Sequence, residues 1–291
     1  MTRTSSLADG GPAPAAPVAV GAAPDTPPGP TRSRQGRPAR HQGLLLGLAG
    51  VAVTLLAWEG CAATGIVNDL LTSRPSDILM TAGDYFTSGT GRRDVVVSAT
   101  EFIVGFALAL VAGLAAGLAV GWWRWLDQLT EPIVSFAYAS PRVALVPMLV
   151  VWFGIGLGSK VAVVFISAVF PIMLNTRTGV RTVDHHLLTV ARALNATRWQ
   201  TLRTVVLPGA VPSIVTGIRL AIGVGLVGMV VGELIASSEG LGYTILYAGN
   251  TLQTSLMFVA LFVVSGAGVA MTAAVRALER RLDRWRPQHH A

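Results

Sequence analysis

The sequence predicts an all-α polytopic membrane protein with six transmembrane helices. Of its 291 residues, 52% are hydrophobic and only 13% are charged, which is about half the charged fraction of an ordinary soluble domain. The charges are also bunched, so that runs of about 17–25 apolar residues, long enough to cross a bilayer as helices, separate them. The stretches without any Asp, Glu, Lys or Arg are 43–58, 102–123, 143–159, 161–176, 204–218, 220–232 and 240–275.

These runs divide the chain into three parts. Residues 1–42 are rich in proline and alanine and end in basic residues, so we expect a disordered segment. Residues 43–276 form the predicted transmembrane domain, and 277–291 form a basic tail. The predicted spans are 43–64, 97–121, 132–153, 160–179, 211–234 and 254–275.

Six spans place both termini on the same side of the membrane. With the N-terminus inside, the interior segments hold 16 basic residues and the exterior segments hold four, Arg74, Arg92, Arg93 and Lys160. Cationic loops stay in the cytoplasm, so we expect cytoplasmic termini in the plasma membrane. A cleavable signal peptide is the alternative for the first apolar run. Its basic region would be unusually long, and we favour a retained span.

Local signals place the shorter elements. Ser73-Arg74-Pro75-Ser76 predicts a turn and a surface helix in the exterior loop 65–96. Gly113, Gly117 and Gly121 repeat at small-xxx-small spacing, which lets two helices approach closely in lipid. Pro141 and Pro147 interrupt the third span, and such breaks face protein or a watery cavity. Residues 153–160 form a tight exterior turn, and 233–250 lie at the outer mouth.

Residues 184–208 form a charged island between the fourth and fifth spans. Asp184 predicts an N-cap for a first helix, whose apolar stripe is Leu187, Val190, Ala191 and Leu194. Asn195 suits the left-handed residue that ends it. Thr197 and Gln200 have capping-box spacing for a second helix, which Leu207-Pro208 closes.

This stretch resembles the EAA loop of the permeases of ABC importers. The pattern there is Glu-Ala-Ala, a glycine four residues after the second alanine, and a terminal Leu-Pro. Here Thr189-Val190-Ala191 stands for Glu-Ala-Ala, Asn195 for the glycine and Leu207-Pro208 for the end. Thr189 and Asn195 depart from the pattern; asparagine tolerates the left-handed conformation, so the bend should survive.

The resemblance extends over 43–286. Leu145 to Gly156, Phe170 to Thr176 and Ser238 to Tyr243 are similar to the sulfonate, taurine and nitrate branch of these permeases. It implies a homodimer, two ABC ATPase subunits, an extracytoplasmic solute-binding protein and a coupling helix that docks into the ATPase. The implied coupling residues are Thr189, Ala191, Arg192, Leu194, Asn195, Trp199, Leu202, Leu207 and Pro208. The alternative is an amphipathic connector that lies on the membrane.

Arg142 and Arg219 fall inside apolar spans, where charge is costly. One interpretation makes them cavity residues that attract an anionic substrate. The other has them reach the inner headgroups or pair with Glu101 or Glu233. The last span ends in a cluster of arginines that would contact anionic lipid.

Several classes of function are disfavoured. The formal charge of +7 comes from interior loops, which argues against nucleic acid. A single cysteine allows no internal disulfide, and the five histidines show no metal-ligand spacing, so we expect no metal and no cofactor. Gly158-Ser159-Lys160-Val161 is no phosphate loop, so a partner would hydrolyse ATP. An ion-coupled secondary transporter and a membrane-anchored enzyme are the alternatives; neither an internal repeat nor a catalytic constellation is visible.

Overall fold

The computed structural model describes the backbone of residues 40–64 and 72–282. The predicted disordered segment and the end of the basic tail lie outside these residues. Contacts divide the chain at Gly50 into two units, and the second unit, which starts at Val51, contains nearly all of the described helices. In the described ranges every regular element is helical, as the sequence predicts for an all-α protein.

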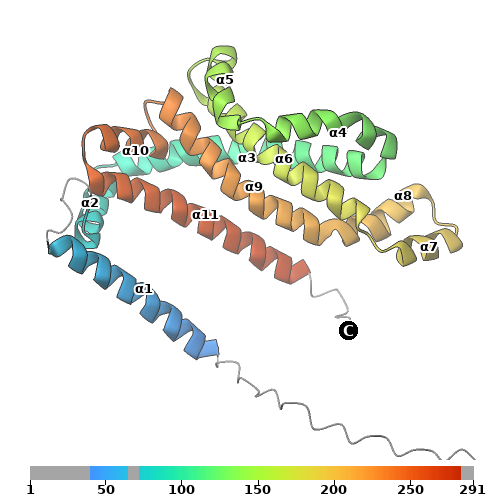
Figure 1. The fold of residues 1–291 in the computed structure, drawn as a ribbon, viewed down its shortest axis with the longest axis horizontal. Helices are drawn as coiled ribbons and strands as arrows, with labels where there is room; N and C mark the ends of the chain where they lie inside the picture. The colour runs from blue at the N-terminus through green and yellow to red at the C-terminus, as the bar shows by residue number, and fades with distance from the viewer. Residues whose placement is uncertain (1–39, 65–71, 283–291) are drawn as a thin grey trace, which may run out of the picture. The chain divides into compact units, whose positions relative to one another are not determined.

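The helices follow one another with short connections (Figure 1). Their bounds are α1 Arg40–Ala63, α2 Pro75–Thr87, α3 Thr90–Trp122, α4 Arg124–Ala139, η1 Arg142–Leu145, α5 Val146–Phe153, α6 Leu157–Arg181, α7 His185–Ala193, α8 Arg198–Thr201, η2 Leu202–Val206, α9 Leu207–Ala236, α10 Leu241–Asn250 and α11 Thr254–Leu282. The predicted surface helix of the exterior loop is α2, where Pro75 occupies the first turn and the Glu59 side chain accepts from the Ser76 amide at 3.2 Å.

Five helices in the described ranges are long and apolar enough to cross a membrane. They correspond to five predicted spans. A sixth span exists if the segments Arg124–Ala139 and Arg142–Phe153 are taken together, but these meet at 89°. The predicted interruption of the third span at Pro141 is therefore confirmed, whereas Pro147 lies in the first turn of α5. Pro141 provides the reason, because proline disfavours a helical residue before it and donates no hydrogen bond, and Ser140 is extended, with ψ at 137°.

Helix α6 packs against α3 on one side and α9 on the other, and these three helices form the centre of the fold (Figure 1). Glycines line the contact between α3 and α6, where an added Cβ at Gly113 would lie 2.9 Å from Ile172 and one at Gly117 would lie 2.6 Å from the Met173 carbonyl. The predicted small-residue stripe is thus a packing surface. Buried side chains of all three helices, including Phe102, Val164 and Ile222, complete the core.

The central helices have two distinct ends. Helices α7 and α8 lie at one end of α6 and α9, and α2 and α10 lie at the other (Figure 1). Near the first end, Asp127 of α4 forms ion pairs with Arg177 at 2.5 Å and with Arg181 at 2.7 Å. These ion pairs connect α4 to the last turns of α6. The end beside α7 and α8 therefore carries a cluster of ion pairs.

Candidate functional site

The loop between α6 and α9 folds as two capped helices. The Asp184 carboxylate accepts a hydrogen bond from the His186 amide at 2.8 Å and starts α7. Asn195 has φ of 52°, so it takes the left-handed conformation that ends the helix. Thr197 and Gln200 form the complete capping box of α8. The predictions for Asp184, Asn195, Thr197 and Gln200 are confirmed.

The predicted end at Leu207-Pro208 is wrong. Helix α8 continues through the π-type segment Leu202–Val206 into α9, so that 198–236 is one helical rod. Pro208 has no N–H to donate to the residue four positions earlier, and its ring crowds that carbonyl. In the π-type turn before it the Leu207 amide donates to the Leu202 carbonyl, and the chain stays helical through this position. The consequence is geometric, because α8 and the span α9 belong to one continuous helix.

One face of this helix pair has no partner within the described chain. Leu187, Val190, Leu194 and Trp199 are 53%, 56%, 77% and 64% exposed. The opposite face packs inward, where Ala191 is buried and half-buried Leu188 and Leu202 approach Val206 and Ala210. Exposed apolar side chains on a rigid, capped scaffold are typical of a protein-binding surface. Arg192 and Arg198 are exposed beside it.

The two intramembrane arginines differ in their surroundings. Arg219 of α9 forms an ion pair with Glu279 of α11 at 2.5 Å. The structure thus bears out the alternative in which this arginine pairs with a carboxylate, but the partner is Glu279 and not Glu101 or Glu233, which bond to Lys160 and to the Gly242 amide. Arg142 follows the break before η1 and pairs with no carboxylate in the described residues. Its guanidinium lies 5.0 Å from the Tyr138 ring centroid and 5.8 Å from that of Phe170.

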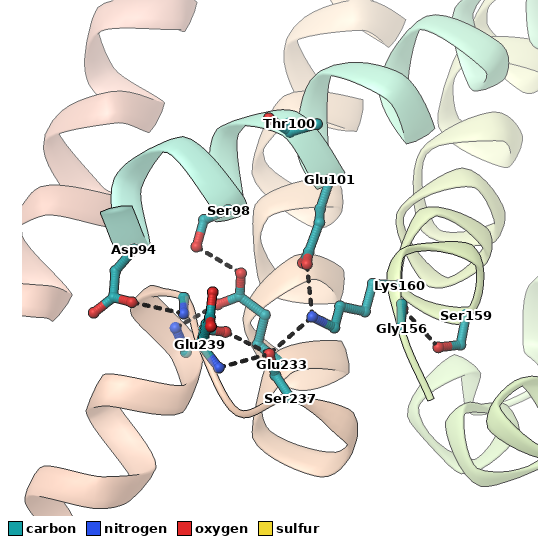
Figure 2. Close-up of polar contacts among 12 residues, drawn as sticks. Asp94, Ser98, Thr100, Glu101, Gly156, Ser159, Lys160, Glu233, Ser237 and Glu239 are labelled. Carbon is teal, nitrogen blue, oxygen red and sulfur yellow. Dashed lines mark hydrogen bonds and ion pairs between the residues drawn. The ribbon is translucent and has the colours of Figure 1, made fainter. Parts of the chain in front are cut away.

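A buried polar network, missed in the sequence, joins α3, α6 and α9 near α10 (Figure 2). The Lys160 ammonium donates to Glu101 at 2.7 Å and to the Ser237 hydroxyl at 2.8 Å. Lys160, expected as an exterior loop charge, is 7% exposed and belongs to the first turn of α6. Glu101 and Lys160 lie toward the N-terminal ends of α3 and α6, which run parallel to each other but are not consecutive in the chain, so no local sequence signal joins the pair.

The same network anchors the turn that precedes α10. The Asp94 carboxylate accepts from the Gly240 amide at 3.0 Å, and the Glu233 carboxylate accepts from the Gly242 amide at 2.5 Å (Figure 2). The Leu241 amide donates to Ser98 at 2.9 Å. Acidic and hydroxyl groups of α3 and α9 therefore satisfy the free N–H groups of the α10 N-terminus. An added Cβ at Gly240 would lie 2.5 Å from Glu233. The absence of a side chain at Gly240 and Gly242 therefore lets the turn approach the Glu233 carboxylate closely.

Beside the turn, Tyr85 of α2 donates to Asp94 at 2.5 Å and lies 3.2 Å from the Thr244 hydroxyl. Burial raises the pKa of the Tyr85 phenol, and its hydrogen bond to Asp94 adds to the effect, so Tyr85 keeps its proton. A hollow of about 780 Å³ opens here, with Arg93 and Glu239 paired at its edge. This end is a rigid polar scaffold around a wide depression.

Apolar helices of spanning length, a broken helix and an exposed helical pair are the features expected of an integral membrane transport subunit. The model of the family "Binding-protein-dependent transport system inner membrane component" matches residues 109–284. The chain belongs to this family of ABC-importer permeases. It is 32% identical to the "Putative aliphatic sulfonates transport permease protein SsuC" of Bacillus subtilis, over 92% of this chain and 96% of that protein.

A second relative is the "Taurine transport system permease protein TauC" of Escherichia coli, with 30% identity over 82% of this chain and 89% of that protein. Among solved structures, an inward-facing form of the MetNI methionine ABC transporter covers 65% of this chain and 97% of its own, with a TM-score of 0.51 and 21% identity. The likeness to this solved structure concerns the fold alone. The resemblance inferred from the sequence motifs is confirmed.

Proposed function

We propose that this chain is the permease subunit of an ABC importer that moves a small organic anion of the sulfonate or taurine type across the plasma membrane. Its relatives support this solute class by name. In the proposal, two copies of the chain form the pathway, two ATPase subunits drive it, and an extracytoplasmic binding protein delivers the solute beside α2 and α10. Both termini and residues 184–208 lie in the cytoplasm. Membership of the family disfavours the ion-coupled secondary transporter.

One observation carries the coupling mechanism, namely the exposed apolar face of α7 and α8 on a helix continuous with α9. In this mechanism the ATPase grips Leu194 and Trp199, with Arg192 at the polar rim. Ala191 and Leu202 pack on the inner face of the pair, and Asn195 holds the left-handed bend between the two helices. Closure of the ATPase pair tilts the rod 198–236 and shifts the pathway between inward and outward packings, so the permease performs no covalent chemistry itself.

Replacement of Trp199 by alanine should weaken the assembly with the ATPase. Trp199 is 64% exposed, so its loss removes docking area without opening a cavity in this chain. Tryptophans at the centre of interfaces contribute about 2 kcal/mol or more, which corresponds to a loss of at least thirtyfold in affinity. The affinity is measured with purified permease and ATPase by titration in detergent, and uptake into vesicles should fall in parallel.

Trp125→Ala is the matched control, because Trp125 is 63% exposed on α4, outside the proposed interface. It should leave the affinity for the ATPase unchanged. Equal affinities of Trp199→Ala and the unmodified chain would contradict the docking surface. Uptake that persists without ATP would contradict an ATP-driven importer altogether.

A further inference from the structure

The break between α4 and η1 places Arg142 on the wall of a cavity. The cavity has a volume of about 270 Å³ and lies between η1, α6 and α9. Transporters commonly build substrate sites from discontinuous helices, and an irregular backbone at membrane depth persists where it lines a cavity. The right-angle turn at Ser140-Pro141 is such a discontinuity. The cavity is therefore a candidate place for a solute to pause.

Arg142 differs from the other basic residues near the central helices of the described chain. Lys160, Arg177 and Arg181 of α6 and Arg219 of α9 all have carboxylate partners. Arg142 has two aromatic rings and one long hydrogen bond, 3.4 Å, to the Ser167 carbonyl. A guanidinium has five N–H donors, and a half-buried cation without an anion is costly in an apolar span. The lining of the cavity therefore favours a ligand that brings a negative charge.

The rest of the lining selects among anions. Valines from η1, α5, α6 and α9 form most of it, and the Ser167 hydroxyl adds a polar group near the guanidinium. Gly228 leaves room for that hydroxyl, since an added Cβ would lie 2.5 Å from Ser167 Oγ. One cation surrounded by valines suits a monoanion with a short alkyl chain. A dianion such as sulfate would leave one charge unpaired in an apolar setting.

We propose that this cavity is a transit subsite in which Arg142 binds the anionic head of a short aliphatic sulfonate and the valines contact its chain. The volume of about 270 Å³ lies just below the usual range of ligand pockets, about 300–1,000 Å³, and suits a small solute. The tetrahedral head accepts from the free guanidinium donors and from Ser167. The subsite deepens the proposed function, on which its ligand class rests, and leaves Arg219 outside the pathway.

The test uses ethanesulfonate as the probe and the full-length permease in detergent. Its dissociation constant is measured by saturation-transfer NMR. Arg142→Gln should weaken binding about ten- to hundredfold, as expected when hydrogen bonds to a charged group are lost, whereas Arg142→Lys should restore part of it. Sulfate should compete more weakly than methanesulfonate. Unchanged binding by Arg142→Gln, or preferential binding of sulfate, would overturn the proposal.

The control variant changes the second arginine of the apolar spans, Arg219, and leaves the net charge of the chain unchanged. The double variant Arg219→Gln/Glu279→Gln removes a paired cation together with its partner and should bind ethanesulfonate like the unmodified chain. Equal loss in this variant would show a nonspecific charge effect and overturn the subsite. Association with the ATPase is measured in parallel and should not change in Arg142→Gln. If the unmodified chain did not associate with the ATPase, the proposed function would be refuted. The ethanesulfonate binding data would still decide the subsite.

Discussion

Replacing Lys160 with methionine is expected to destabilise the permease by about 3–5 kcal/mol, the usual effect of breaking a buried ion pair from one side. Glu101 is 2% exposed, and Lys160 is its one ion-pair partner in the described part of the chain. Its second oxygen, Oε2, is buried without a hydrogen bond there. The variant would therefore leave a carboxylate with no compensating charge, and the midpoint of thermal unfolding in detergent should fall by roughly 6–20 °C.

The double variant Lys160→Met/Glu101→Met separates this effect from lost packing. When both charges are replaced by apolar groups of similar volume, the change in stability is commonly small or favourable. Most of the lost stability should therefore return. A single variant that melts within about 2 °C of the unmodified chain, or a double variant no better than the single, would show that the charge of Glu101 is compensated elsewhere.

Features with local causes could be predicted from the sequence. The cap of Asp184 reaches two residues along the chain, and the capping box of Thr197 and Gln200 spans three. The left-handed Asn195 depends on its own side chain and backbone. Five of the apolar runs form helices that are long and apolar enough to span a membrane. An apolar segment in a bilayer must satisfy its backbone hydrogen bonds internally, and a helix does so. Predictions of this kind require no knowledge of which elements meet.

Features that depend on tertiary partners could not be predicted. Glu101 finds Lys160 across 59 positions, and Arg219 finds Glu279 across 60. A hydropathy profile describes each charged residue only within its own apolar segment. It does not show which side chains a neighbouring helix places beside that residue. Pro208 illustrates a second limit. A proline inside a helix usually kinks or breaks it, yet here Val206 and Ala210 pack against Val180 and the chain stays helical through a π turn.

These two kinds of feature meet in α6. Its first turn carries Lys160 in the polar network, its middle packs glycine stripes of α3 and α9, and its last turns pair with α4. These contacts hold α6 to its neighbours at three levels along its length. In the proposed mechanism a force on α8 would thus shift α9 together with α6 and α3, and the broken segment at Ser140 would absorb the difference.

The contact between α3 and α6 therefore should tolerate little change in size. Gly117→Leu is expected to destabilise the permease by about 3 kcal/mol or more, at or above the upper end of ordinary overpacking. The obstacle is backbone as well as side chain, because an added Cβ would lie 2.6 Å from both the Met173 carbonyl oxygen and Thr176 Cβ. A carbonyl inside a helix cannot rotate away, so the two helices must separate and lose contacts along their length. Thermal unfolding in detergent measures the loss.

Gly266→Leu provides the control, since an added Cβ on that residue of α11 meets nothing within 4 Å. Both variants place the same side chain in the middle of an apolar helix, so helix propensity and hydropathy change equally and only the neighbouring backbone differs. The stability of Gly117→Ala should fall between that of Gly117→Leu and that of the unmodified chain, because even a single added carbon lies closer to its neighbours than van der Waals contact allows. Equal stability of Gly117→Leu and Gly266→Leu would mean that α3 and α6 repack freely, and in the proposed mechanism they could not transmit motion from α8.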